Sequence, residues 1–209
     1  MISITPDDLY RVVVGVDPSV TSGPNADETG IVVAASGPHQ PDSCSIETCT
    51  THAYILQDAT LPRSNKNSID RWIDRVIEMY DTWNASLVVV EGNQGQELLE
   101  MSLRTKRPDL PIKRPNATEN KKARAEPIVA LYEQGRIHHV GDPSKFALLE
   151  EQMTTWVPGE GGKRTKVSPD RVDALVWAVA ELNLQGSRFK RKPPVVEAIG
   201  IAGRNSWAI

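Results

Sequence analysis

Two runs of β-branched residues, each ending in an acid, constrain the fold of this chain most. Arg11 to Asp17 (RVVVGVD) and Ser86 to Glu91 (SLVVVE) are short, largely apolar and followed directly by Pro or Gly. Continuous apolar runs of this length are typical of strands that are covered on both faces of a sheet. Each run therefore predicts a buried strand that carries one carboxylate, Asp17 or Glu91, at its carboxyl end.

The rest of the chain alternates between strand and helix patterns. Residues 29–36 (TGIVVAAS) predict a second strand, placed to pair with the first as a hairpin. Apolar residues recur at helical spacing from Ile69 to Tyr80 and predict an amphipathic helix. By the same reasoning we expect further strands at 52–57 and 112–114, and further helices at 94–104, 118–134, 142–154 and 168–184.

This order of elements predicts an α/β fold. Antiparallel strands come first, and helices then alternate with strands that we expect to be parallel. The predicted architecture is a mixed central β-sheet flanked by helices on both faces. We expect one domain over residues 1–185, followed by a basic, partly flexible C-terminal tail at 186–209.

Composition excludes several classes of protein. The 209-residue chain is 39% hydrophobic and 24% charged, a mixture typical of soluble globular proteins. No apolar run approaches the roughly 18 residues that a membrane span needs, and the N-terminal segment lacks the features of a signal peptide. Two cysteines, Cys44 and Cys49, are too few for a disulfide framework. We therefore expect a cytoplasmic protein that does not contact membranes.

Acidic residues recur where ligands bind in sheets of this kind. Asp17 and Glu91 end two predicted strands, and the ends of neighbouring strands meet at one edge of an open α/β sheet. Asp170 and Asp173 lie on one face of the last predicted helix. Gathered carboxylates repel unless a cation neutralises them, and Mg²⁺ and Mn²⁺ prefer oxygen ligands. Because two such ions held about 3.5–4 Å apart can promote phosphodiester hydrolysis, the pattern predicts phosphoryl chemistry.

Each acid also has a structural explanation when it is taken alone. Asp17 and Glu91, which precede Pro and Gly, could simply open turns. Asp170 could serve only the helix dipole, and Asp173 could form a surface ion pair. A structural explanation of all four acids together needs several coincidences, whereas a metal site needs one.

The basic residues are clustered, although the net charge of −3 does not by itself indicate a nucleic-acid partner. One cluster spans 104–124, a second 163–166 and a third 188–192. Any one cluster could be solvated surface, but three of them beside candidate metal carboxylates favour DNA, whose phosphates they can neutralise. The candidate DNA contacts are Lys121, Lys122, Arg124, Lys163, Arg164 and Lys166.

Four segments together resemble the nuclease domain of the large terminase subunit of tailed bacteriophages. They are VVVGVDPSVTSG…DETGIVVA, LVVVEGNQG, KKARAEPIVALYEQGRIHHV and SPDRVDALVWAVAEL. The resemblance covers roughly Tyr10 to Leu184, and the joint order of the segments is more specific than any one of them. It implies a ribonuclease H-like fold and a metal-dependent endonuclease. The implied cofactors are two ions of Mg²⁺ or Mn²⁺, and the implied reaction is cleavage of double-stranded DNA during genome packaging.

The resemblance also implies roles for individual residues. Asp17 matches the metal-binding aspartate of the first strand, Glu91 the second acidic position and Asp170 the aspartate of the third motif. We therefore expect these three residues to be catalytic and to bind metal. Asp173 matches a position that is acidic in some relatives, and we include it among the expected metal ligands.

A complete large terminase carries an ATPase domain ahead of its nuclease, and no such domain is recognisable in this sequence. The best candidate for a phosphate-binding loop, 157–164 (VPGEGGKR), lacks the first Gly and the Ser or Thr after Lys. The resemblance thus implies the nuclease part alone. It also implies an ATPase motor domain, a portal protein and a small terminase subunit as partners, and the host cell cytoplasm as location if the chain is phage-encoded.

Two other functions remain open. The VGVDPS segment and the DxxDAL helix also resemble bacterial Holliday-junction resolvases, although the segment KKARAEPIVALYEQGRIHHV argues against them. A non-catalytic actin-like or ribonuclease H-like binding module would need a glycine-rich phosphate loop after the first strand, which 18–23 (PSVTSG) fits only faintly. Such a module has no need to gather four acids, so a metal titration separates it from the nucleases.

Two weaker features could also involve the site. Asp27 and Glu28 precede the second predicted strand and could reach the metals if the hairpin is tight. His138 and His139 fall in a predicted strand and would point to opposite faces, so one of them could approach the site. A packing role is the simpler expectation for both histidines.

Overall fold

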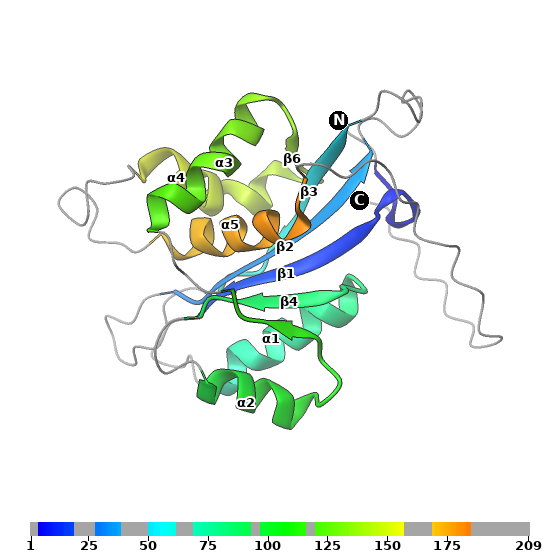
Figure 1. The fold of residues 1–209 in the computed structure, drawn as a ribbon, viewed down its shortest axis with the longest axis vertical. Helices are drawn as coiled ribbons and strands as arrows, with labels where there is room; N and C mark the ends of the chain where they lie inside the picture. The colour runs from blue at the N-terminus through cyan, green and yellow to red at the C-terminus, as the bar shows by residue number, and fades with distance from the viewer. Residues whose placement is uncertain are drawn as a thin grey trace.

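The chain forms one mixed β-sheet with helices on both faces (Figure 1). The structure is a computed structural model, and it describes residues 4–18, 28–38, 50–61, 69–92, 97–115, 120–156 and 169–184. Among these residues, six strands pair in the order β5-β4-β1-β2-β3-β6. Their bounds are Arg11–Asp17 (β1), Gly30–Pro38 (β2), Thr51–Asp58 (β3), Leu87–Val90 (β4), Ile112–Lys113 (β5) and Ile137–His139 (β6).

The strand directions follow the predicted order, antiparallel first and parallel later. β1 pairs antiparallel with β2, and β2 pairs antiparallel with β3. β4 joins the other side of β1 in parallel, and β5 and β6 add parallel strands at the two edges. The predicted hairpin and the predicted mixed sheet are therefore confirmed.

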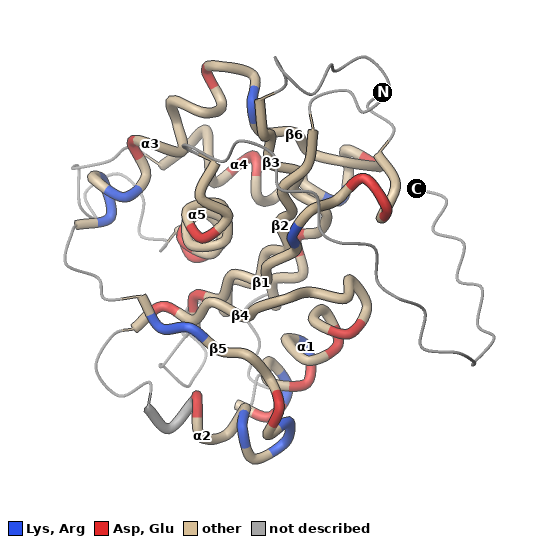
Figure 2. Tube along the Cα trace, turned by 45° about the vertical axis from the view of Figure 1, so that its right-hand side comes forward, with Lys and Arg blue, Asp and Glu red and all other residues tan. Residues whose placement is uncertain are grey.

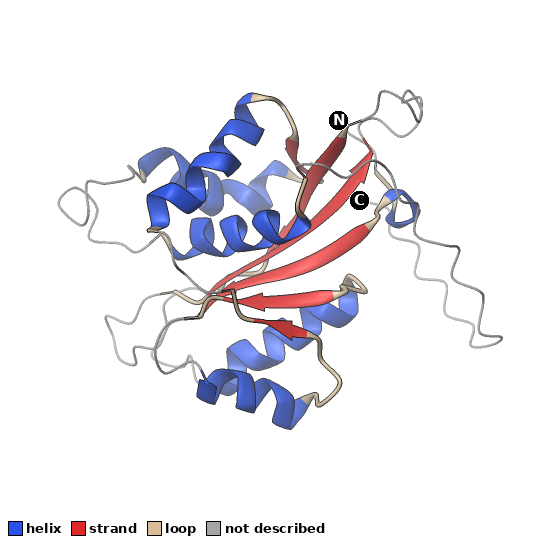
Figure 3. Ribbon diagram, in the orientation of Figure 1, coloured by secondary structure: helices blue, strands red, loops and turns tan. Residues whose placement is uncertain are grey.

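The helices cover the two faces of the sheet (Figure 3). α1 (Ile69–Thr82) and α2 (Glu97–Lys106) lie on one face, and α3 (Lys121–Glu133), α4 (Ala147–Thr155) and α5 (Asp170–Leu182) lie on the other. Val12, Val14 and Val16 of β1 belong to the core that contains α1, whereas Val13 belongs to the core that contains α5. Because alternate side chains of a strand point to opposite faces, a strand between two cores is apolar throughout.

Helix α5 lies directly against the backbone of β1 and β2, and two glycines make this approach possible. A Cβ atom on Gly15 would lie 2.3 Å from the carbonyl oxygen of Ala174, and one on Gly30 would lie 2.0 Å from that of Asp170. Both distances are shorter than a side chain tolerates. Nearly every residue of α5 is buried, so this helix is the central element of its layer.

Two helices begin later than predicted, and a proline lies at the predicted start of each. The segment predicted as helix over 142–154 starts as a 3-10 helix, η2 (Pro143–Phe146), and continues as α4. The Asp142 side chain caps η2 by accepting a hydrogen bond from the amide of Ser144 (2.9 Å). α5 begins at Asp170, with Pro169 as its N-cap residue. A second 3-10 helix, η1, spans Pro6–Asp8.

The predicted C-terminal tail at 186–209 lies outside the described residues, so the proposed boundary at residue 185 stays a prediction. Among the described helices, none is both long enough and apolar enough to cross a membrane.

We predict that Gly15→Ala destabilises the protein by about 3 kcal/mol, because the new methyl group would collide with the backbone of α5 and force it off the sheet. Urea unfolding measures the change in free energy. Gly135→Asn is the control: Gly135 has a φ of 65° with nothing within 4 Å of an added Cβ, and Asn tolerates that conformation. Equal stabilities of the two variants would mean that α5 does not approach β1 this closely.

Candidate active site

The carboxyl ends of β1 and β4 bring two acids together. Asp17 is the last residue of β1, and Glu91 directly follows β4. The two strands are parallel neighbours, and the amide of Glu91 donates a hydrogen bond to the carbonyl oxygen of Val16 (3.0 Å). The side chains of Asp17 and Glu91 are hydrogen-bonded to each other. The structure thus places two of the predicted site residues side by side.

Helix α5 adds two more acids from its first turn. Asp170 and Asp173 are both buried, each with 4% of its surface exposed. The backbone of Asp170 lies against Gly30, and Gly30 is the residue paired with Asp17 across β1 and β2. The start of α5 is therefore held over the end of β1. Asp173 is close enough to Asp17 and Glu91 for their negative charges to interact.

Two cations from the first turn of α3 face these acids. The Lys121 ammonium forms an ion pair with the carboxylate of Asp173. Nη2 of Arg124 lies 3.3 Å from Oε1 of Glu91, and the Arg124 guanidinium stacks over the Trp177 ring at 4.5 Å. Lys121 and Arg124 are three residues apart in a helix and so share one face. The basic start of α3 and the acidic start of α5 therefore meet at the end of the sheet.

The ionisation of these groups is strongly coupled. Burial raises the pKa of Asp17 to about 10, and the hydrogen bond to Glu91 and the charges of Glu91 and Asp173 contribute to the rise. Burial also raises the pKa of Asp173, while Lys121 opposes that rise. Burial lowers the pKa of Lys121, but the surrounding carboxylates raise it overall. The raised pKa values favour a neutral Asp17 and a charged Lys121, because buried like charges repel.

The donor set fits a hard divalent cation in chemistry and in charge. Asp17, Glu91, Asp170 and Asp173 offer only oxygen ligands, which such ions prefer. The Lys121 ammonium balances part of the carboxylate charge that a metal ion would otherwise neutralise. Within the described residues, no three His, Cys, Asp or Glu side chains already converge as a metal-binding group. Two of the carboxylates are instead engaged by Lys121 and Arg124.

Of the other predicted DNA contacts, the structure describes Lys122, which pairs within its own helix rather than with the carboxylates of the site. The Lys122 side chain is 55% exposed and lies 4.0 Å from Glu126, on its own helix. Lys163, Arg164 and Lys166 lie outside the described residues. Among the predicted contacts that the structure describes, Lys121 and Arg124 thus lie at the carboxylates, whereas Lys122 does not.

The basic cluster that begins at Arg104 is largely neutralised within the protein. Basic and acidic residues are interspersed over α1 and α2 (Figure 2). The ion pairs are Arg104–Glu100, Lys106–Asp74, Arg107–Asp81 and Arg114–Glu100. The density of positive charge in this stretch of sequence therefore does not translate into an equally basic surface.

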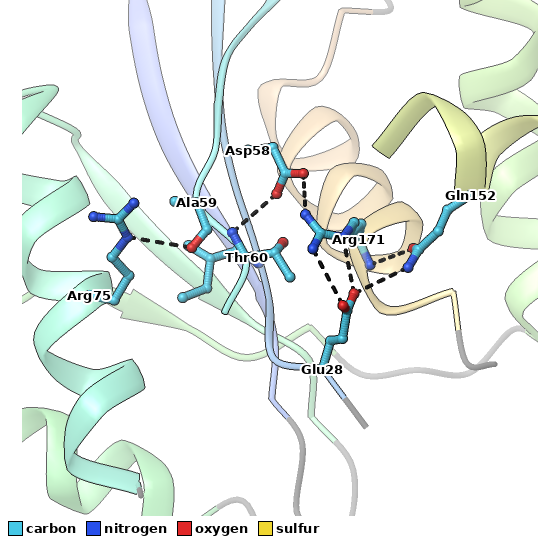
Figure 4. A network of polar contacts seen from close by, with 8 residues as sticks. Glu28, Asp58, Ala59, Thr60, Arg75, Gln152 and Arg171 are labelled. Carbon is cyan, nitrogen blue, oxygen red and sulfur yellow. Dashed lines mark hydrogen bonds and ion pairs between the residues drawn. The ribbon is translucent and has the colours of Figure 1, made fainter. Parts of the chain in front are cut away.

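A buried arginine cluster was not predicted from the sequence. Arg171 of α5 binds Glu28 (Nε to Oε2, 3.0 Å) and Asp58 (Nη1 to Oδ2, 2.5 Å) (Figure 4). Glu28, which could have reached the metals, is therefore engaged by an arginine. Glu28 and Arg171 are 143 residues apart, so no local pattern indicates their contact.

The two histidines of β6 point to opposite faces, as predicted. His138 Nε2 lies 2.8 Å from Nδ1 of His52 on β3, whereas His139 lies 2.8 Å from the Tyr132 hydroxyl and 2.7 Å from Glu150. β6 is the edge strand beyond β3 and is separated from β1 by two strands. Their contacts are those of packing residues at that edge.

Known proteins share this fold. The family model of the terminase RNaseH-like domain matches residues 14–182. The crystal structure of the large terminase nuclease from thermophilic phage G20c aligns with a TM-score of 0.53 and 15% identity, over 83% of this chain and 86% of that chain. The structure of the same nuclease with bound zinc aligns with a TM-score of 0.52 and 13% identity, over 83% and 85%.

The structure of Thermus thermophilus RuvC gives a TM-score of 0.43 and 16% identity, over 84% of this chain and 97% of that chain. No curated protein sequence matches the chain. The family match extends from β1 to the end of α5 and includes all four acids of the site. The ribonuclease H-like fold that the sequence predicted is thus present, and the chain belongs to the family of terminase RNaseH-like domains.

Proposed function

We propose that this chain is a metal-dependent endonuclease that cleaves double-stranded DNA, as the nuclease part of a phage DNA-packaging terminase. The observation that carries the proposal is the burial of several carboxylates around a single lysine at the carboxyl ends of β1 and β4. Burying like charges is costly. A module that only bound a partner would have no use for such an arrangement.

In this proposal Asp17, Glu91, Asp170 and Asp173 hold the metal, as two ions of Mg²⁺ or Mn²⁺. Asp17, Glu91 and Asp170 are the catalytic residues. Bound there, a pair of ions supplies the Lewis acidity that activates a water and stabilises the leaving oxygen in phosphodiester hydrolysis. The chain prepares the site by holding two acids on rigid strand ends and two on the first turn of α5.

The protein's own cations complete the site. Lys121 and Arg124 neutralise the acids before substrate arrives and offer positive charge to a DNA phosphate when it enters. Arg124 is restrained by its stacking on Trp177, so its guanidinium is oriented in advance. Lys122, Lys163, Arg164 and Lys166 would contact the DNA backbone, which positions the duplex without reading its sequence.

The family context supports further partners. A terminase nuclease works beside an ATPase motor domain, and we propose that motor, a portal protein and a small terminase subunit as partners in the host cytoplasm.

Incubation with supercoiled plasmid and Mg²⁺ or Mn²⁺ tests the proposed reaction. We expect nicking and linearisation that a chelator abolishes and that Asp17→Asn lowers at least about 100-fold, since even an outer partner of a metal ligand is worth 10–100-fold. Asp109→Asn, an exposed acid paired with Arg107, is the control. Cleavage that survives Asp17→Asn or the chelator would refute the carboxylate site. Cutting of four-way junctions but not plasmid would favour a resolvase instead.

We predict that Lys121→Met lowers kcat about 100-fold, as expected when one charge is removed from beside a reacting phosphate. Lys122→Met should raise KM slightly and leave kcat unchanged, because its side chain is exposed and apart from the acids. Steady-state kinetics on a short duplex measures both parameters, and thermal unfolding verifies that the variants are folded. Equal effects of the two substitutions would contradict the separate roles.

The raised pKa of Asp17 predicts a pH-dependent stability for the metal-free protein. The folded state keeps a proton that the unfolded state loses above pH 4, so the free energy of unfolding falls as pH rises from about 4 toward 10. The limiting slope for one proton is about 1.4 kcal/mol per pH unit. Asp17→Asn should flatten this dependence and stabilise the protein at pH 8. Urea unfolding in chelator at pH 5 and pH 8 measures it. A variant as pH-sensitive as the unmodified protein would contradict the assignment.

A further inference from the structure

Arg171 makes an unusually complete set of contacts for an arginine beside an active site. Its side chain is 5% exposed. The guanidinium donates to both oxygens of Glu28 (3.0 and 3.4 Å) and to Oδ2 of Asp58 (2.5 Å) (Figure 4). The backbone amide of Arg171 donates to Oε1 of Gln152 (3.1 Å), and Nε2 of Gln152 donates in turn to Glu28 (3.3 Å). Arg171, Gln152 and Glu28 therefore form a closed ring of hydrogen bonds.

These contacts tie the start of α5 to three other elements. Glu28 lies two residues before β2, Asp58 ends β3 and Gln152 belongs to α4. Asp58 is itself fixed, because its Oδ1 accepts a hydrogen bond from the amide of Thr60 (3.1 Å). A planar guanidinium held from two sides restrains direction as well as distance.

The start of α5 needs such an anchor. Its N-cap residue, Pro169, makes no side-chain capping hydrogen bond. The contacts at Gly15 and Gly30 set how closely α5 approaches the sheet, and the directional hydrogen bonds of Arg171 add a restraint on the rotation of the helix about its own axis. That rotation decides where Asp170 and Asp173 point. Asp17 and Glu91, in contrast, are placed by the paired backbones of β1 and β4.

The network is poorly explained by stability alone. Burying an arginine with two carboxylates carries a desolvation cost that its attraction only partly repays, and apolar substitutes are often as stable. Directional hydrogen bonds next to a site that demands defined ligand positions offer a better explanation, since outer partners orient the ligands of a metal.

We propose that Arg171 is a positioning residue that sets the rotation of α5 and thereby aims Asp170 and Asp173 at the site completed by Asp17 and Glu91. The inference rests on the proposed metal-binding function. Arg171 itself would touch neither the metal nor DNA and acts only through α5.

Calcium binding measured by calorimetry tests the inference without relying on cleavage. We expect Arg171→Lys to weaken Ca²⁺ binding about 10-fold or more, because an ammonium cannot bind Glu28 and Asp58 in the same geometry. Glu28→Gln, a milder change that keeps Asp58 as a partner, should weaken it less. With Mg²⁺ and a range of plasmid concentrations, kcat should fall while the KM for DNA stays within about 2-fold.

Arg136→Lys is the matched control. Arg136 donates to the carbonyl oxygens of Thr51 (2.8 Å) and Leu184 (2.9 Å), next to the other end of α5. We expect it to lower the melting temperature as Arg171→Lys does, with Ca²⁺ affinity unchanged. Unchanged Ca²⁺ affinity in both Arg171→Lys and Glu28→Gln would overturn the positioning role alone. No Ca²⁺ binding by the unmodified protein would instead overturn the metal site, and this inference with it.

Discussion

The close contact between α5 and the paired strands β1 and β2 is the constraint on which the rest of the structure depends. At Gly15 and Gly30 no side chain separates the helix from the sheet. The helix can therefore bring its first turn to the place where β1 ends. Without this approach, the two acids of α5 would lie too far from Asp17 and Glu91 to interact with them. The close packing of α5 on the sheet thus brings the buried acids together.

The electrostatic feature is a group of buried acids that the protein neutralises with its own charges. Lys121 and Arg124, from α3, bind two of the carboxylates, and burial raises the pKa of Asp17, which favours its neutral form. α3 is placed on the same face as α5, so helix packing again determines which charges meet. The proposed metal would enter a site that already holds positive charge, and its binding would release a proton from Asp17.

The sequence predicted the strands and the acids at their ends because both signals are local. A β-branched run that ends in Asp17 or Glu91 identifies a strand and its terminal carboxylate without knowledge of the fold. The partners of those acids could not be predicted in this way. Lys121 meets Asp173 across 52 residues, and Arg171 meets Glu28 across 143. Both contacts depend on how helices cross the sheet, which Gly15 and Gly30 decide and which no periodicity reveals.

The ion pairs over α1 and α2 have a consequence for how DNA would associate with the protein. A surface lysine or arginine that is already paired with an acid of the protein is less available to neutralise a DNA phosphate and release the counterions condensed on it. Each phosphate that is neutralised contributes about 0.9 to the slope of log affinity against log salt concentration. Arg104, Lys106 and Arg107 are paired in this way. The surface over α1 and α2 would therefore add little to the salt dependence of association. The strongest electrostatic attraction for a DNA duplex would lie on another part of the protein.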